Sequence, residues 1–252
     1  MLLLLACASA SQAEIYSAKV IRVEGGMMVF QANGTELQAK IEAKTHFWRR
    51  RAVVDAFKFN PGDGVTINVR VNEKGYFLRE VIDSESSRWL GFIRKGVMLG
   101  TLRGGDKEGI LVELADGSRY KYRLTENATV LLGGRPAKSS DLRQGMVVFI
   151  KGRTTSTLDT SVATISDTPL RTEPPKKDEP GTLVGEVTEF DSEKRVLNLK
   201  NGDLDSRVVL DKLSVGDASR LAAKAFVWLV VERTDSGLLR AVEFHAVSSP
   251  KQ

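Results

Sequence analysis

The chain has 252 residues, of which 42% are hydrophobic and 27% charged, a composition typical of soluble globular proteins and not of disordered ones. The formal net charge of +5 is mild, so charge alone does not indicate a nucleic-acid-binding protein. One cysteine (Cys7) and two histidines (His46 and His245) leave little material for a disulfide, a metal site of thiolates or imidazoles, or a histidine-based triad. We therefore expect no metal, no cofactor and no catalytic residues.

The first 13 residues, MLLLLACASASQA, have a short apolar block followed by small residues, as in a signal peptide. The small-x-small pattern predicts cleavage after Ala13 and export to the periplasm, the cell surface or the medium. Because no basic residue precedes the block, we expect the leader to continue upstream of Met1. Two alternatives stay open. Leu4–Cys7 resembles the bacterial lipobox, in which Cys7 would be lipidated and held at a membrane, or the segment is a strand or helix of the fold.

The first unit, residues 14–83, alternates between apolar and polar positions as half-buried strands do. Asn33-Gly34 is its strongest turn signal, because both central residues of a type I′ hairpin need positive φ. Strands are expected over residues 18–23, 27–32, 36–43, 65–71 and 76–82. Between the third and fourth of these, His46–Phe59 has apolar residues at helical spacing and predicts a short helix across one end of a barrel.

The second unit, residues 88–167, follows a polar junction at Ser84–Ser87 and is expected to begin with a strand over Trp89–Leu102. Its clearest stretch is Ile110–Lys151, in which an apolar run, an Asp-Gly turn and an alternating run describe a β-meander. A Gly-Gly turn and a further apolar run follow, and a closing strand is expected over Thr160–Ile165.

A linker, residues 168–180, contains four of the seven prolines and almost no apolar residues, so we expect it to be extended and semi-rigid. The third unit, residues 181–247, repeats the opening hairpins. Leu213–Lys224 replaces the middle segment and is expected to contain a helical turn. Ala225–Val231 is continuously apolar, which predicts a strand buried on both faces. Because only the linker joins it to the second unit, we expect packing between the first two units instead.

The hairpin glycines Gly34, Gly117 and Gly202 are separated by 83 and 85 residues, and each follows Asn or Asp. A period near 84 is too long for a solenoid and is typical of tandem small domains. The fold class is therefore all-β: three tandem OB-like or SH3-like barrels of five to six strands, with a short helix or loop between the middle strands.

The second unit carries a family resemblance in Thr129–Ala137 (TVLLGGRPA) and Asp141–Val148 (DLRQGMVV), together with the glycine-turned hairpins. These stretches resemble the small tandem OB-like β-barrel domains of uncharacterised function in exported bacterial proteins. The resemblance implies a fold and an exported protein, and it implies no activity or functional residue.

Two basic groups are the candidate binding residues. Trp48 with Arg49, Arg50 and Arg51 could stack bases or bind a polyanion, or Trp48 could pack in the fold with the arginines in solvent. Three further basic residues share the outward face of one strand, where they could bind phosphates or serve as a solvated surface. They are Arg119, Lys121 and Arg123.

The acidic pairs Asp203/Asp205 and Asp106/Glu108 lie in turns and gather few oxygens for calcium. The preferred hypothesis is a non-enzymatic exported protein whose barrels form a binding or scaffolding module of the cell envelope, with an envelope protein or a polyanion as partner. The alternative is a polyanion- or nucleic-acid-binding protein that uses the two basic groups.

Overall fold

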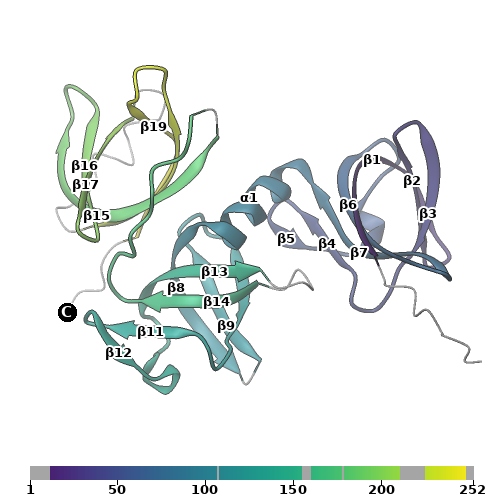
Figure 1. The fold of residues 1–252 in the computed structure, drawn as a ribbon, viewed down its shortest axis with the longest axis horizontal. Helices are drawn as coiled ribbons and strands as arrows, with labels where there is room; N and C mark the ends of the chain where they lie inside the picture. The colour runs from purple at the N-terminus through teal and green to yellow at the C-terminus, as the bar shows by residue number, and fades with distance from the viewer. Residues whose placement is uncertain (1–11, 107, 155–159, 178, 211–224, 248–252) are drawn as a thin grey trace, which may run out of the picture. The chain divides into compact units, whose positions relative to one another are not determined.

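The computed structural model describes residues 12–106, 108–154, 160–177, 179–210 and 225–247. The chain divides into two compact units, Met1–Leu90 and Gly91–Gln252, and each is described by itself. The helix α1 (Ser84–Lys95) begins in the first unit and ends in the second. Strands form almost all of the remaining regular structure (Figure 1).

The first unit contains a barrel of five strands. Their order is β3-β2-β1-β6-β7, and parallel pairing of β3 with β7 closes the ring. Strand three beside strand five is the Greek-key order of an OB-type barrel, which decides between the two predicted types. The strands are β1 (Gln12–Glu24), β2 (Met27–Ala32), β3 (Thr35–Lys40), β6 (Gly64–Asn72) and β7 (Gly75–Asp83).

Alternating inward residues of these strands form the core of the first barrel. Met28, Phe30, Ile67 and Leu78 are almost completely buried in it. Asn33 and Gly34 have φ of 50° and 79°, so the predicted left-handed hairpin turn is confirmed. The pattern of alternation and the Asn-Gly dipeptide were therefore sufficient to place the first hairpin.

The helix predicted within His46–Phe59 is wrong. The segment forms a hairpin of β4 (His46–Arg49) and β5 (Ala52–Val53), followed by the 3-10 turn η1 (Ala56–Lys58). β4 pairs in parallel with β7 and extends the sheet beyond the ring. Two of the apolar residues that suggested a helix, Val53 and Phe57, are exposed, so they mark no buried helical face.

The start of the second unit also differs from the prediction. Ser84–Lys95, predicted as a junction and the beginning of a strand, is the helix α1. The Asp83 carboxylate accepts a hydrogen bond from the Ser86 backbone N–H at 2.7 Å, so Asp83 caps the helix. The strand β8 (Val97–Asp106) follows only after Gly96. The apolar residues of the Trp89–Leu102 run are thus divided between a helix and a strand.

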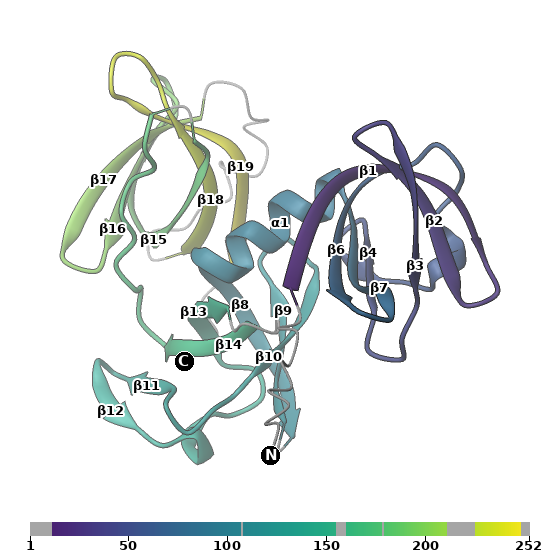
Figure 2. The ribbon, with the colours of Figure 1, turned by 45° about the vertical axis from the view of Figure 1, so that its right-hand side comes forward.

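The second barrel repeats the strand order of the first. β10-β9-β8-β13-β14 form the ring, and a parallel bridge between β10 and β14 closes it. The hairpin β11–β12 lies beside β14, as β4–β5 lies beside β7 (Figure 2). The strands are β9 (Gly109–Leu114), β10 (Arg119–Arg123), β11 (Thr129–Leu132), β12 (Arg135–Ala137), β13 (Val147–Thr154) and β14 (Thr160–Ser166); η2 (Ser139–Asp141) is a 3-10 turn.

The third barrel is closed in the order β15-β16-β17-β19-β18. The segment predicted to hold a helical turn, Leu213–Lys224, lies outside the described residues. The described barrel therefore consists of its ring. The strands are β15 (Gly181–Asp191), β16 (Val196–Asn201), β17 (Leu204–Val209), β18 (Phe226–Arg233) and β19 (Leu239–Val247).

The third barrel packs against the second within the second unit. Trp228 is 1% exposed, and its indole N–H donates a hydrogen bond to the Val97 carbonyl at 3.2 Å. Its ring meets Phe92 edge-on, and Phe226 meets Phe149 in the same way with ring centroids 5.1 Å apart. These contacts bury the outer face of β18 and explain its continuous apolar run. They also show that the linker is not the only attachment of the third barrel.

The linker itself is anchored to the third barrel. Asn201 is completely buried at the end of β16. Its side-chain carbonyl accepts a hydrogen bond from the Thr172 backbone N–H at 3.1 Å, and its amide donates to the Thr172 carbonyl at 3.0 Å. In this barrel the Asn-Gly dipeptide therefore serves both the hairpin and the path of the linker.

The described part of the N-terminus begins inside the fold. Gln12 and Ala13 are the first residues of β1 and pair with Val71 and Arg70 of β6. Cleavage after Ala13 would therefore shorten β1 by two residues. Cys7, the alternative lipidation residue, lies outside the described residues. None of the described helices is long and apolar enough to cross a membrane.

Candidate functional site

One end of the first barrel carries a row of outward side chains beside two loops. OB barrels bind their ligands on the face of strands two and three and at the loops that join strands one to two and four to five. In the first barrel these loops are Gly25-Gly26 and Glu73-Lys74. Four residues near this end of the barrel lie in register across four strands and are called the first row: Met27, Lys40, Phe77 and Arg70.

The first row points away from the core. The neighbouring row of Ala39, Tyr76 and Val71 faces inward and packs in or against the core, so the next residues along each strand face outward. The Arg70 guanidinium lies over the Phe77 ring, 4.9 Å from its centroid. One guanidinium nitrogen donates to both Glu42 carboxylate oxygens, at 3.1 and 3.2 Å. An oriented arginine thus covers an aromatic ring.

Lys40 is the cation of the first row that has no acidic partner among the residues that the structure describes. It is the last residue of β3 and is exposed. Two strand spacings of about 4.8 Å place its Cα about 10 Å from that of Arg70, with Phe77 between them. Both side chains are long enough to reach one anionic group or two successive ones.

The second barrel has an equivalent row at the same end. Gly109 follows the loop between β8 and β9, Arg123 ends β10, and Ser161 and Arg153 flank the loop between β13 and β14. The four residues are in register and are called the second row: Gly109, Arg123, Ser161 and Arg153. The two rows therefore place a cation on strand three and a second cation on strand four.

The cations of the second row are open to solvent. Arg123 and Arg153 are both exposed, and neither guanidinium has an acidic partner among the described residues. Ser161 between them is 4% exposed, and its hydroxyl donates a hydrogen bond to the Arg153 carbonyl at 3.2 Å. A Cβ at Gly109 would lie 2.1 Å from the Tyr122 carbonyl oxygen, so this position is restricted to glycine and leaves Arg123 uncovered on that side.

The third barrel lacks this pair of cations. Its equivalent positions are Val196, Val209, Arg240 and Glu232, called the third row. A valine stands on strand three and a carboxylate on strand four, with one arginine between them. All three barrels therefore have the same strand order, but the charge of the row residues at the loop end differs in the third.

Two of the predicted strand residues take part in an ion-pair network. Arg119 contacts Glu113 at 3.2 Å, and Arg103 contacts the same carboxylate at 3.0 Å. Lys121 contacts Asp106 at 2.8 Å and Glu108 at 3.4 Å. All three predicted residues are exposed on one face, as strand alternation requires. Arg123 alone of the three belongs to a row.

These ion pairs shift the acid–base equilibria of their members. A hydrogen bond from Lys121 holds the pKa of Asp106 below its ordinary value, and one from Arg103 does the same for the pKa of Glu113. The bond to Asp106 raises the pKa of Lys121 in return. The acidic pair Asp106/Glu108, which the sequence analysis considered as a calcium site, therefore binds the ammonium group of Lys121.

Trp48 and Arg49 from the first predicted group support the fold. Trp48 is 7% exposed and packs against Trp89 of α1, with ring centroids 5.8 Å apart. Arg49 forms an ion pair with Asp63 at 2.9 Å, and its guanidinium lies over Phe59. The indole is thus unavailable for stacking, and the Arg49 charge is used within the barrel.

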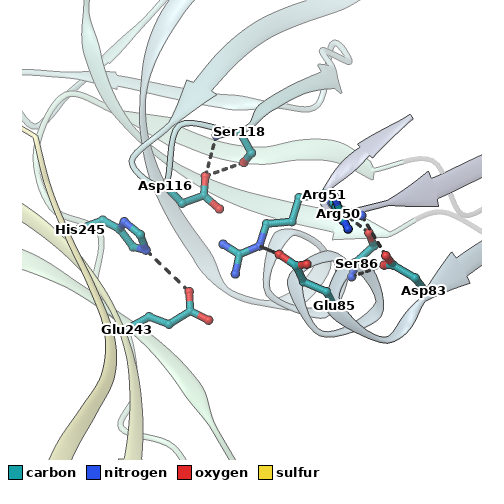
Figure 3. A network of polar contacts seen from close by, with 9 residues as sticks. All are labelled: Arg50, Arg51, Asp83, Glu85, Ser86, Asp116, Ser118, Glu243 and His245. Atoms are coloured by element: carbon teal, nitrogen blue, oxygen red, sulfur yellow. Dashed lines mark hydrogen bonds and ion pairs between the residues drawn. The ribbon is translucent and has the colours of Figure 1, made fainter. Parts of the chain in front are cut away.

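Arg50 and Arg51 form the tip of the β4–β5 hairpin, and both have left-handed backbone, with φ of 52° and 63°. The backbone N–H groups of Arg50 and Arg51 donate to the Asp83 carboxylate and the Ser86 hydroxyl, each at 2.9 Å. The Arg51 side chain also meets Glu85 at 3.2 Å (Figure 3). The tip is therefore fixed to the first turn of α1.

The equivalent tip in the second barrel is Gly133-Gly134, with φ of 57° and 74°. Its first N–H donates to the Asp167 carboxylate at 2.9 Å, just as Arg50 donates to Asp83. Glycine adopts this conformation without strain, whereas other residues lose about 1–2 kcal/mol. Two arginines thus occupy a turn for which the second barrel uses two glycines.

The remaining polar candidates have local partners. His46 lies edge-on to Trp48, with ring centroids 6.3 Å apart. His245 is 3.6 Å from Glu243 (Figure 3), and its ring is tilted against that of Trp228, with ring centroids 5.5 Å apart. Asp203, of the other acidic pair, contacts Arg171. In the described part of the chain, no group of three or more His, Cys, Asp or Glu side chains is arranged to hold a metal ion.

The three cations and the aromatic residue that matter most in the rows, besides Arg123, were not recognised as candidates in the sequence. The 83-residue period contained the necessary signal, because it relates Arg123 to Lys40 and Arg153 to Arg70. We applied the period only to the turn glycines. It identified the repeat in this way, but the equivalent cations were not compared. The residues concerned are Lys40, Arg70, Phe77 and Arg153.

No family model and no curated protein sequence matches the chain. Among solved structures, it is similar to one described as Drosophila Unr CSD456, with a TM-score of 0.24 and 11% identity over 95% of this chain and 99% of that one. It is also similar to a multidomain protein with nucleic acid binding domains from Streptococcus pneumoniae TIGR4, with a TM-score of 0.29 and 9% identity over 95% of this chain and 74% of that one. Both TM-scores are below 0.5, so the function has to follow from the chain's own residues.

Proposed function

We propose that the chain is a non-catalytic binding protein for a polyanion, and that the first and second rows are its anion contacts. One observation carries the proposal. Two barrels place cations at the same register positions, beside the loops at which OB barrels bind their ligands. A solvated surface needs polar residues, but it does not need two cations at equivalent positions of two repeats.

The electrostatics of the second row support this function. Arg123 and Arg153 are exposed and lack acidic partners among the described residues, so a bound anion need not displace a carboxylate there. Arg119 and Lys121, by contrast, already contact Glu113 and Asp106. An anion would have to compete with these carboxylates, which makes the predicted strand as a whole a weaker site than the row.

The proposal favours the alternative hypothesis over an envelope scaffold. The cations of the rows call for an anionic ligand, whereas a scaffold role calls for no particular charge on its partner. Export is a separate proposal, supported by the composition of residues 1–13. An exported protein would meet anionic polymers of the envelope or medium, and a retained protein would meet nucleic acids. The charge contacts at the rows are the same for both.

Fluorescence anisotropy with labelled heparin and a labelled oligonucleotide of about 20 nucleotides tests the proposal. We expect binding at about 50 mM salt that weakens steeply by about 200 mM, because binding releases counterions. Two row variants, Lys40→Glu and the pair Arg123→Glu with Arg153→Glu, should each weaken both ligands by about tenfold, or about 1.4 kcal/mol.

The control is Lys200→Glu with Arg207→Glu, which makes a similar charge change on exposed positions of β16 and β17 in the third barrel. It should change affinity by less than about threefold if binding is local to the rows. Absence of binding at low salt would refute the proposal. An equal loss in the control would show that net charge, and not the rows, governs the affinity.

A further inference from the structure

We infer that the first row selects single-stranded nucleic acid among polyanions by stacking a base on Phe77 and Arg70, an inference that rests on the proposed function. A sulfated or phosphorylated polymer offers only charge to a basic row. A single-stranded nucleic acid also offers unpaired bases, which stack on aromatic rings and on guanidinium planes. The first row combines both kinds of group.

Phe77 is placed where a base could reach it. It lies on the outer face of β7, as the third residue after the Glu73-Lys74 loop, and it is partly exposed. Tyr76, its neighbour, packs against the core, so strand alternation directs Phe77 away from the core. Phe77 is only partly buried, and its position among cations points to a ligand.

Arg70 and Phe77 together form a platform of two layers, the phenyl ring and the guanidinium above it. Its guanidinium is 4.9 Å from the centroid of the Phe77 ring, and the Glu42 carboxylate holds one of its nitrogens from the side. Both groups are planar and sequence-tolerant stacking partners, because every base has a π-face. The ion pair with Glu42 already restricts the Arg70 side chain. Binding a base therefore costs less side-chain conformational entropy.

Lys40 completes the site. It stands in register with Phe77 on the strand opposite Arg70, and it is exposed. A base over Phe77 and Arg70 would bring its own phosphate within reach of the Lys40 ammonium group. One nucleotide would then be held by stacking and by charge, as in other proteins that bind single strands without sequence preference.

The other two rows lack the stacking element. Ser161 takes the place of Phe77 in the second row, and Arg240 takes it in the third. Two other aromatic residues of the second barrel, Tyr120 and Tyr122, point inward and are at most 8% exposed. The second row is therefore suited to a phosphate or sulfate group, whereas the first is suited to a nucleotide.

The test compares Phe77→Leu with Phe77→Tyr on three probes: heparin, a thymidine oligonucleotide of about 20 nucleotides, and an abasic chain of the same length. Leucine keeps an apolar side chain and removes the π-face, and tyrosine keeps the ring. Circular dichroism of both variants establishes that the barrel is folded. We expect Phe77→Leu to weaken the oligonucleotide about 5- to 100-fold, while Phe77→Tyr stays within about threefold of the original protein.

Heparin and the abasic chain are expected to bind both variants within about twofold of the original protein, because neither has a base to stack. Equal loss of heparin and oligonucleotide in Phe77→Leu would overturn the inference, as would an oligonucleotide affinity that does not change. If heparin, oligonucleotide and abasic chain all fail to bind the original protein, the proposed function itself is wrong. If all three bind equally well, only the selection by Phe77 is refuted.

Discussion

The first and third barrels share one strand order and differ at the loop end where the rows lie. The first places Lys40 and Arg70 on either side of an aromatic ring, whereas the third places Val209 and Glu232 on either side of Arg240. The ring of hydrogen-bonded strands depends on inward residues, which both barrels keep apolar. The outward residues at the loop end are free of that constraint, so under the proposed function they can differ with the ligand of each barrel.

In the third barrel, outward and end residues make contacts that support the fold. Trp228 contacts Phe92 and the Val97 carbonyl, and Asn201 holds Thr172 of the linker. We therefore regard the first and second barrels as ligand barrels and the third as a supporting barrel of the second unit. Each of the following changes tests one side of this contrast.

Trp228→Ala should have the largest effect, and it should act on stability alone. Removing a buried tryptophan at the contact between the second and third barrels costs about 3–5 kcal/mol of unfolding free energy. Chemical denaturation followed by fluorescence and circular dichroism measures the loss. Trp228→Phe keeps most of the ring contact and removes the N–H to Val97, so it should cost about 1–2 kcal/mol. If Trp228→Ala leaves stability unchanged, the third barrel does not support the second.

Val209→Lys with Glu232→Arg would give the third barrel the charges of a ligand barrel. The change adds two cations and removes one carboxylate at exposed or half-exposed positions, so we expect oligonucleotide affinity at low salt to rise about tenfold. Isothermal titration should also show an additional binding event. Ser206→Lys with Asp205→Arg, placed on β17 near the β16–β17 turn, makes the same charge change away from the third row and is the matched test of location. An equal gain there would mean that the loop end has no special role.

Arg50→Gly tests the contrast between the two ligand barrels at the hairpin tip. The second barrel has glycine at the equivalent left-handed position, Gly133, and both residues donate their N–H to an aspartate. Relief of backbone strain, less the conformational entropy of glycine, should stabilise the first unit by about 0.5–1 kcal/mol. Thermal and urea unfolding measure the gain. Gly133→Arg should be destabilising by a similar amount, and the opposite sign in either variant would contradict the strain at Arg50.

Asp106→Asn with Glu113→Gln should have the smallest effect, a gain of about two- to threefold in polyanion affinity at neutral pH. The two carboxylates hold Lys121, Arg103 and Arg119, and neutral amides would release these cations. The pKa of each carboxyl is depressed in the folded protein, so its contribution to stability is present above the unfolded value, about pH 4, and is lost as the pH falls through the lower folded value.

The pH dependence of binding follows from the same shifts. The original protein should approach the affinity of the double variant only below about pH 4, where protonation opens the ion pairs. Anisotropy titrations between pH 3.5 and 7, on both proteins, measure this convergence. An affinity that falls with acidification in the original protein and not in the variant would contradict the masking of Lys121.

The sequence predicted the barrels well, because their determinants are local. Alternation placed the strands, and dipeptides such as Asn33-Gly34 and Asp116-Gly117 placed the left-handed turns. The two errors came from reading apolar residues without their structural context. Val53 and Phe57 suggested a helix although they are exposed, and Trp89 was assigned to a strand although Asp83 caps a helix before it.

The candidate site could not be predicted in the same way, because each row is assembled from strands that are far apart in the sequence. Lys40 and Arg70 become neighbours of Phe77 only when β3, β6 and β7 pair. The local cluster that stood out in the sequence, Trp48–Arg51, has partners inside the fold, as Trp48 and Arg49 show. Of the predicted residues, Arg123 is the one that the structure places in a row.

The salt dependence of oligonucleotide binding tests the central claim most directly. The slope of log affinity against log salt reports the number of phosphates that cations neutralise, about −0.7 for each on a single strand. Lys40→Ala should make the slope shallower by about 0.7, Arg123→Ala with Arg153→Ala by about 1.4, and the three changes together by about 2.1, because the charge of Arg70 is already paired with Glu42. Slopes that stay at the original value in all three variants would show that the rows do not hold the ligand.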